Sequence, residues 1–369
     1  MMYKPIFKPH FQVEVVPEEG VLLLSERGHH SLTGRLFELV APLVDGTRSP
    51  DEIVDCLAGE LPPAEVYYAL SLLEKKSYLA DGNTTNSLAG FWTARGVDPD
   101  KAVDRLRKQQ VSVAAIGDVN AGPLIPVLES FGIHVTEDGT LQVVFTDDYL
   151  RAGLEACNED ALKNKRPWML VKPVGIEIFV GPLFVPDTTG CWRCLRDRHI
   201  LNRGVERFIM DRKGRKDPVP GPEVHAPATV QVACSMAAIE IAKWIASGQN
   251  REIEGGMFSL DTRTWQTRRH TLNRLPHCPS CGKPLDAETR LLPVLLRDGR
   301  AAFTRDGGYR TRSPEETLKK FDHLVSPVTG IVNSLERDDS LEGSVHVYFA
   351  GHNCAETKTS LFSRAGCGL

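Results

Sequence analysis

The sequence predicts an α/β protein that opens with a small winged helix-turn-helix domain and continues into a sheet of alternating strands and helices. Short strands and helical periods share the first 82 residues, and buried strands alternate with helices after residue 111. Two Cys-x-x-Cys pairs follow farther along. With 369 residues, the chain is long enough for roughly two or three domains.

The composition excludes several protein classes. Apolar residues make up 41% of the chain and charged residues 25%, which are ordinary values for a globular protein with a sizeable core. The net charge of -4 lacks the excess of positive charge that is typical of nucleic-acid-binding proteins. No signal segment opens the chain and no apolar run approaches the length of a membrane span, so we expect a cytoplasmic protein without a membrane partner. In that compartment, nine cysteines favour metal binding or burial over disulfides.

The first domain is expected over residues 1–82. Its strands are expected at residues 10–16, 21–25 and 29–33. Its helices are expected at residues 35–44, 49–57 and 63–76. Ser49 is a good N-cap that is followed by Pro50 and, three positions on, by Glu52, which is the capping-box spacing. Residues 78–80 close the domain as a strand or wing.

A polar stretch from Asp81 to Ser87 ends this domain, and residues 83–110 are expected to link it to the next through one helix over 91–110. Four strands are expected beyond it, at residues 111–116, 133–135, 141–146 and 168–171, and the first of them reads as buried. A helix over 124–131 lies between the first two of them. Such alternation predicts a parallel sheet that is covered by helices on both faces.

The two cysteine pairs predict a structural zinc site. A two-residue gap lets two thiolates on one tight turn reach one tetrahedral ion, and two such pairs close the coordination sphere. The four expected ligands are Cys191, Cys194, Cys278 and Cys281. Gly190 and Gly282 flank the pairs and suit the sharp turns. The alternatives are chance pairs or a redox pair, but neither pair clearly follows a strand at a helix N-terminus.

A glycine turn follows the first buried strand of the second domain. Strand, glycine turn and helix form the arrangement that cradles nucleotide phosphates. Gly117 and Gly122 hold its outer positions, but Val119 stands where the middle glycine is needed for phosphate to approach. Glu137 or Asp138 follows about 20 positions later, in a turn where acidic residues are common anyway. The pattern favours a structural remnant over a nucleotide site.

The middle of the chain resembles a known adenylating fold. Gly190 to Leu195 resembles the first zinc knuckle of the ThiF-type, ubiquitin-activating-like fold. Pro220-Gly221-Pro222 with residues 233–248 resembles its next helix, and residues 258–281 resemble its final strands and second knuckle. The resemblance covers about 111–285 and implies a Rossmann-type scaffold domain over 111–290.

The two ends of the chain extend this resemblance. The winged helix resembles a RiPP recognition element, which binds the leader of a ribosomally made precursor peptide. Residues 307–317, 326–332 and 347–353 resemble the opening of a YcaO domain, expected over 291–369. Together the three modules resemble the cyanobactin-type heterocyclases, the azoline-forming cyclodehydratases of TOMM biosynthesis. In that family the YcaO domain continues for several hundred residues and binds ATP and magnesium. Either this chain is therefore truncated or its catalytic domain is a separate polypeptide, and no catalytic residue is assigned here.

The resemblance implies a function and a peptide site. Such proteins bind a leader and present its core for ATP-dependent conversion of Cys, or Ser and Thr, to thiazoline or oxazoline. The leader adds a strand beside the third strand of the winged helix and reaches a groove at the third helix. The implied contact residues are His29, His30, Ser31, Leu32, Thr33, Val66, Tyr67, Leu70, Leu73 and Lys75. Val66, Leu70 and Leu73 have an alternative interpretation as plain core. The family also implies a homodimer.

Two other functions compete with this interpretation. The first is a ThiF-like ATP-dependent adenylyltransferase that acts on a carrier protein or peptide, which needs a working phosphate turn. The second is a DNA-binding winged helix, which needs a basic recognition helix. Glu65 and Glu74 offset Lys75 and Lys76 on that helix, so we expect no nucleic-acid partner.

Overall fold

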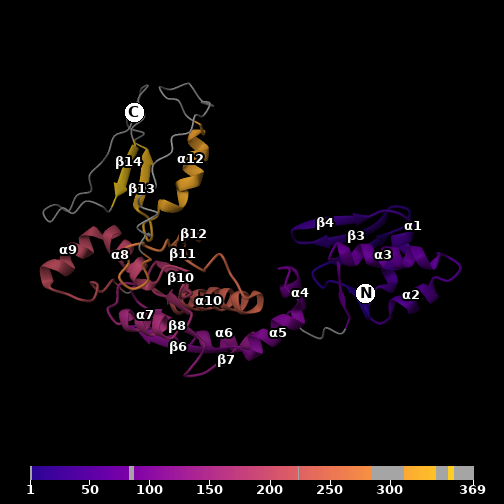
Figure 1. The fold of residues 1–369 in the computed structure, drawn as a ribbon, viewed down its shortest axis with the longest axis horizontal. Helices are drawn as coiled ribbons and strands as arrows, with labels where there is room; N and C mark the ends of the chain where they lie inside the picture. The colour runs from indigo at the N-terminus through magenta and orange to yellow at the C-terminus, as the bar shows by residue number, and fades with distance from the viewer. Residues whose placement is uncertain (1, 83–86, 223, 284–310, 338–347, 353–369) are drawn as a thin grey trace. The chain divides into compact units, whose positions relative to one another are not determined.

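The computed structural model of the chain describes residues 2–82, 87–222, 224–283, 311–337 and 348–352. The chain forms two compact units, Met1–Leu106 and Arg107–Leu369 (Figure 1). Several features named above lie outside the described residues: the boundary at 290, most of the polar stretch at 83–86, the motif residues 307–310 and 347, and the tail 353–369.

The first unit contains the expected winged helix. Its strands are β1 (Pro5–Phe7), β2 (Gln12–Val16), β3 (Gly20–Ser25), β4 (Gly28–Leu32) and β5 (Leu79–Asp81). Its helices are α1 (Arg35–Val40), the 3-10 turn η1 (Ala41–Leu43), α2 (Pro50–Cys56) and α3 (Pro63–Lys75). Strands β2, β3 and β4 form an antiparallel sheet with β3 in the middle, and β1 pairs with β5.

Local chemistry explains these boundaries. The Ser49 hydroxyl accepts the Glu52 backbone N–H at 3.2 Å and the Glu52 carboxylate accepts the Ser49 N–H at 2.7 Å, so the predicted capping box starts α2. The helix expected over 35–44 divides into α1 and η1 because Pro42 has no N–H to continue the α-helical pattern. Strand β1 was not predicted, since three residues that include a proline carry almost no strand signal.

The expected single linker helix is wrong. The structure has two short helices there, α4 (Ala89–Thr93) and α5 (Pro99–Lys108). Gly96 between them adopts a left-handed φ of 72°, and Pro99 lacks the N–H that a continuous helix would need. These two backbone features stop the helix that the apolar period alone favoured.

The second unit is built on a seven-stranded sheet in the order β12-β11-β10-β9-β8-β6-β7. The strands are β6 (Gln110–Ile116), β7 (His134–Val135), β8 (Leu141–Thr146), β9 (Trp168–Lys172), β10 (Glu177–Phe184), β11 (Gly256–Asp261) and β12 (Gln266–Thr271). Strands β6 to β9 are parallel as expected, but β9 to β12 pair antiparallel, so the sheet is mixed. The short connections from β9 to β10 and from β11 to β12 allow antiparallel pairing, since a parallel pair would need a crossover. Strands β10 and β11 pair antiparallel as well, although residues 185–255 with α8, α9 and α10 lie between them.

Helices cover this sheet, and strands β8, β9 and β10 are almost continuously buried. The helices are α6 (Leu124–Ser130), α7 (Leu154–Lys163), α8 (Trp192–Asn202), α9 (Gly204–Lys213) and α10 (Pro227–Ser247). Helix α10 packs against α6, β9 and β10, whereas α7 packs against α8. A separate group of elements follows near the C-terminal end (Figure 1): α12 (Pro314–Phe321), η2 (Asp322–Leu324), β13 (Val332–Arg337) and β14 (Tyr348–His352).

Helix α10 corrects the expectation that no apolar run approaches membrane-spanning length. Its 21 residues are long and apolar enough, by length and composition, to cross a membrane, and no other helix among the described residues is. Eight of them are buried inside the unit. Packing of this kind against a sheet is typical of a core helix.

Candidate metal centre and peptide-binding edge

The four cysteines of the two pairs come together in one cluster. Their sulfur atoms all lie within 4.8 Å of one another. The Cys191 and Cys278 sulfurs are 3.7 Å apart, and those of Cys194 and Cys281 are 3.4 Å apart. A tetrahedron with metal–sulfur bonds of about 2.3 Å has edges of about 3.8 Å, so this cluster has the dimensions of a four-thiolate site. The residues therefore fit a zinc ion.

Two backbone turns present these sulfurs. Cys191 is the N-cap of α8, which places Cys194 in the first turn of that helix. A Cβ at Gly282 would lie 2.4 Å from the Cys278 carbonyl oxygen, so only glycine fits after the second pair. A Cβ at Gly190 would lie 3.3 Å from the Arg274 backbone, where the two segments approach each other closely. Gly282 thus has the role in a tight turn that the sequence predicted, whereas Gly190 allows the close approach of two segments.

Hydrogen bonds to sulfur favour the thiolate form at one position. The Cys191 thiol and the Leu275 backbone N–H, 3.4 Å away, lower the pKa of Cys194. Burial raises the pKa of Cys281. Cys191, Cys194 and Cys278 are each at most 5% exposed. Several thiolates cannot share so small and dry a space without a cation, which is what a metal ion supplies.

The first cysteine turn is anchored in the core of the unit. The Asn158 side-chain oxygen accepts the Trp192 backbone N–H at 3.0 Å. The Trp192 indole donates to the Tyr149 carbonyl at 2.9 Å. The side chains of Tyr149, Asn158 and Trp192 are at most 2% exposed. A closed, rigid site of this kind is typical of structural rather than catalytic zinc.

The glycine turn after β6 holds one of the protein's own carboxylates. The Asp118 backbone N–H donates to Asp147 at 3.0 Å, and a Cβ at Gly117 would lie 2.2 Å from the Asp147 carboxylate. Arg151 donates to the same carboxylate, with its Nε 2.7 Å away. These donors hold the pKa of Asp147 below its usual range although partial burial raises it. A phosphate at this turn would have to displace Asp147 and pass Val119.

Other charged groups lie at the carboxyl ends of the parallel strands. Asp148 pairs with Arg203 at 2.7 Å. Lys172 at the end of β9 donates to the Glu177 carbonyl at 2.7 Å, and burial lowers its pKa. The sequence reasoning missed all of these residues. Asp147 and Asp148 directly follow the predicted strand over 141–146, and ligand crevices of open sheets lie at strand carboxyl ends, so a signal was present.

Strand β4 forms one edge of the winged-helix sheet. His29, His30, Ser31 and Thr33 are exposed, whereas Leu32 is 3% exposed and belongs to the core. The two-residue turn between β3 and β4 closes on the Ser25–Gly28 pair. The alternation of antiparallel pairing then directs the backbone groups of His29 and Ser31 to the open edge. The predicted strand is therefore placed where a further strand could pair.

The predicted groove residues on α3 need correction. Val66, Leu70 and Leu73 are at most 3% exposed and lie in the domain core, so the alternative interpretation of them as core is the correct one. The Tyr67 hydroxyl donates to the Asp51 carboxylate at 2.6 Å, and so it is held against α2. Lys75 is exposed. The apolar face of α3 is therefore used for packing inside the domain and is not available to a ligand.

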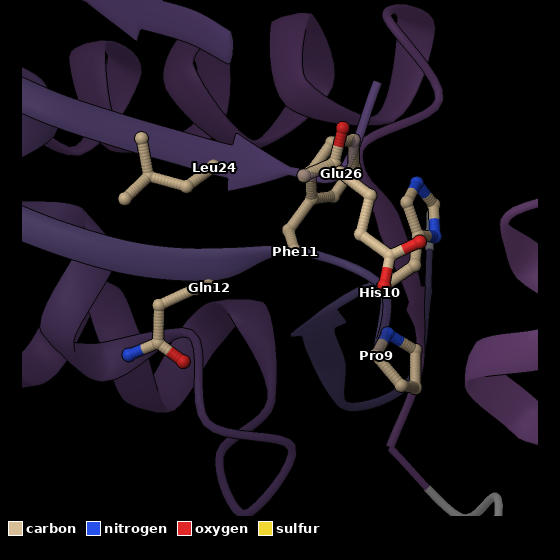
Figure 2. A pocket seen from close by; sticks show the side chains of 7 residues that line it. Pro9, His10, Phe11, Gln12, Leu24 and Glu26 are labelled. Carbon is tan, nitrogen blue, oxygen red and sulfur yellow. The ribbon is translucent and has the colours of Figure 1, made fainter. Parts of the chain in front are cut away.

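An aromatic cluster, Phe11, His30 and Tyr78, lies beside the β4 edge and was missed. The rings of His30 and Tyr78 are 4.9 Å apart, and Phe11 contacts both edge-on at 5.8 and 5.7 Å. Next to Phe11, a shallow pocket of about 400 Å³ is lined by residues 9–12 and 24–26. Figure 2 shows these side chains projecting from the approach to β2 and from the end of β3. Sequence spacing cannot show that residues 11, 30 and 78 meet.

Comparison with known proteins adds three findings. The family described as Winged Helix-turn-helix domain matches residues 6–81. A solved heterocyclase in complex with substrate and cofactor is 36% identical with a TM-score of 0.81, covering 95% of this chain and 48% of its own. The heterocyclase TruD is 36% identical with a TM-score of 0.78, covering 89% of this chain and 49% of its own. No curated protein matches the sequence significantly.

A more distant likeness concerns the fold alone. Escherichia coli MccB is 14% identical with a TM-score of 0.55, covering 80% of this chain and 99% of its own. This agrees with the adenylating-type fold expected for the middle of the chain. By contrast, the chain spans about half the length of the heterocyclases that it matches.

Proposed function

This chain is a relative of the heterocyclases, of whose length it spans about half, and on that premise we propose that it binds the leader of a precursor peptide. The leader belongs to a ribosomally synthesised peptide whose core is to be cyclised. The observation that carries the proposal is the open edge of β4 in a winged helix. An extended peptide pairs readily with such an edge through main-chain hydrogen bonds.

The β4 edge offers the two features that strand addition requires, which are free backbone hydrogen-bonding groups and side chains that can select a sequence. The backbone groups of His29 and Ser31 supply the hydrogen bonds, because they point away from β3. Side-chain selectivity comes from the aromatic cluster, in which His30 is the member that β4 contributes. Lys75 adds a positive charge that suits an acidic leader. We retain Thr33 as a contact at the end of the strand and remove the three core residues of α3.

Leader binding serves chemistry on another part of the peptide. Tethering the leader raises the effective concentration of the core at the catalytic centre. In a complete heterocyclase, the YcaO domain holds ATP and magnesium and activates a backbone amide, which the side chain of Cys, Ser or Thr then attacks. Heterocyclisation by this chain would need that domain, either as a continuation or as a separate catalytic partner. We place the assembly in the cytoplasm as a homodimer.

The cysteine cluster has a structural role in this proposal. Zinc held by Cys191, Cys194, Cys278 and Cys281 would join the start of α8 to the segment after β12. Its four sulfur ligands leave no position for water or substrate. The metal therefore stabilises the middle domain without taking part in cyclisation.

Hydrogen exchange on the intact chain tests the binding site. When a synthetic leader encoded beside this gene is added, the amides of His29 and Ser31 are expected to become protected. The amides of β2, at the opposite edge of the same sheet, serve as the internal control. Protection at β2 instead of β4, or at neither, would contradict the proposed site.

A further inference from the structure

A buried turn ties the C-terminal elements to the middle of the chain. It runs from Ser326 to Gly330, and we call it the 326–330 turn. Its Ser326, Val328 and Thr329 are 3%, 3% and 6% exposed. The Asn202 side chain, at the end of α8, donates to the Ser326 carbonyl at 3.4 Å and to the Gly330 carbonyl at 3.2 Å. Two backbone carbonyls of the turn are thus bound by one side chain of another element.

A second bond network fixes the turn from the sheet side. His270 of β12 lies between two hydroxyls, Ser259 at 2.8 Å from Nε2 and Ser326 at 2.7 Å from Nδ1. The Ser326 hydroxyl oxygen already accepts the N–H groups of Val328 and Thr329, each at 3.1 Å. Its hydrogen is therefore the one available to His270 Nδ1, and the Nε2–H donates to Ser259. This assignment of hydrogen-bond donors and acceptors requires that the His270 imidazole is neutral.

Backbone hydrogen bonds and a glycine hold the 326–330 turn in the conformation that makes these contacts. The Ser326 N–H donates to the Val332 carbonyl at 2.8 Å, and the Gly330 N–H donates to the Ser326 carbonyl at 3.1 Å. A Cβ at Gly330 would lie 2.3 Å from the Ser326 nitrogen, so glycine is required there. The Val328 side chain also attaches the turn to the middle domain, because it packs in the same core cluster as Phe179.

The C-terminal elements around the turn are bound far less well. Leu318 and Phe321 of α12 are 59% and 45% exposed, and Leu335 of β13 is 44% exposed. Within the described residues, β13 and β14 form a two-stranded sheet, which has little stability of its own. The position of α12, β13 and β14 therefore depends on their contacts with the seven-stranded sheet and its helices.

We propose that the 326–330 turn is the anchor that holds α12, β13 and β14 on the middle domain in one orientation. Asn202 of α8 and His270 of β12 bind it through the side-chain hydrogen bonds described above. Release of this anchor frees the C-terminal elements while the seven-stranded sheet stays folded. The proposal concerns contacts within this chain and does not depend on leader binding.

The test compares two single variants of the full-length chain by hydrogen exchange. Asn202→Ala removes both bonds to the turn carbonyls, and exchange at the Ser326 and Gly330 amides and across β13 is expected to rise roughly tenfold. The amides of β8 and β9 should exchange as in the wild type. Asn250→Ala is the matched control, since the Asn250 side chain also donates to another element, Glu240 of α10, and is buried at least as deeply as the half-buried Asn202.

Two outcomes would overturn the anchor. In the first, exchange in the turn and in β13 is unchanged by Asn202→Ala. In the second, β8 and β9 open together with the turn, which would make the turn one part of a single cooperative core. Ser326→Ala gives an independent check, because it removes the hydroxyl that binds His270 and should reproduce the local opening.

Discussion

The sulfur atoms of Cys191 and Cys278 lie 3.7 Å apart although the residues are 87 positions apart in the chain. A contact of this length joins the helix α8 to the segment beyond β12. The same cluster includes Cys194 and Cys281, so each end contributes two ligands. The geometry makes the metal a cross-link between distant segments.

Loss of one ligand should remove this cross-link. Cys278→Ser is expected to abolish stoichiometric zinc and to lower the melting temperature, because the three remaining ligands no longer complete the coordination sphere that cross-links the two segments. Metal analysis by mass spectrometry checks the first result and a thermal melt the second. Cys56→Ser is the matched control, since Cys56 is exposed and far from the cluster in sequence. A zinc-replete Cys278→Ser protein would refute the assignment.

Truncation of a core residue of α3 tests the corrected role of that helix. Leu73→Ala should cost about 2–5 kcal/mol of folding free energy, because the leucine is fully buried in the winged-helix core. Lys75→Ala, two positions away and exposed, should change stability by less than about 0.5 kcal/mol. Chemical denaturation of both variants gives the two values. Equal and small effects would mean that Leu73 lies on an open groove.

The stability of the second unit should depend on pH through His270. Burial and the nearby Arg268 lower the pKa of His270 from 6.5 to about 4. The unfolded chain binds a proton below about pH 6.5 while the folded chain does not, so stability is complete above pH 6.5 and falls as the pH drops toward 4. The full loss for this group is about 3 kcal/mol. Urea unfolding at pH 7, 6 and 5 measures it.

A His270→Gln variant isolates this contribution. Its cysteine cluster is intact, so any loss of metal in acid affects both proteins alike. The variant should be less stable at pH 7 but should lose less stability between pH 6.5 and 5. An unchanged slope would show that His270 does not carry the pH dependence. His199, whose pKa is also lowered to about 4 by burial, would then be the next group to vary.

Nucleotide activation by this chain alone is expected to be absent. The Asp147 carboxylate, paired with Arg151, lies against the glycine turn, and Val119 replaces the glycine that would admit a phosphate. An ATP–pyrophosphate exchange assay, with and without candidate peptide, measures this directly. Exchange above background would favour the alternative of an adenylyltransferase.

Much of the site could be predicted because its signals are local. The two-residue cysteine gaps and the flanking Gly190 and Gly282 specify knuckle turns wherever they occur. The Ser49 capping box likewise fixed the start of α2 from four adjacent residues.

The missed features depend on contacts between distant residues. His270 meets Ser326 across 56 positions, and Phe11 meets Tyr78 through packing alone. Val66 and Leu73 have the apolar spacing of a groove as well as that of a core, and only burial separates the two. The antiparallel half of the sheet depends on β10 and β12, two strands that the apolar pattern did not resolve.

Leader binding at β4 is the central claim, and a proline scan of the strand tests it most directly. The Ser31 N–H points to the open edge, so Ser31→Pro removes a bond to the peptide without removing a bond to β3. Fluorescence polarisation with a labelled leader should show binding by the wild type and by Ser31→Ala but a loss of at least about tenfold for Ser31→Pro. Hydrogen exchange in β3 confirms that the variant is folded. Equal affinity of a folded Ser31→Pro protein, or no binding of any leader encoded beside this gene, would contradict the account.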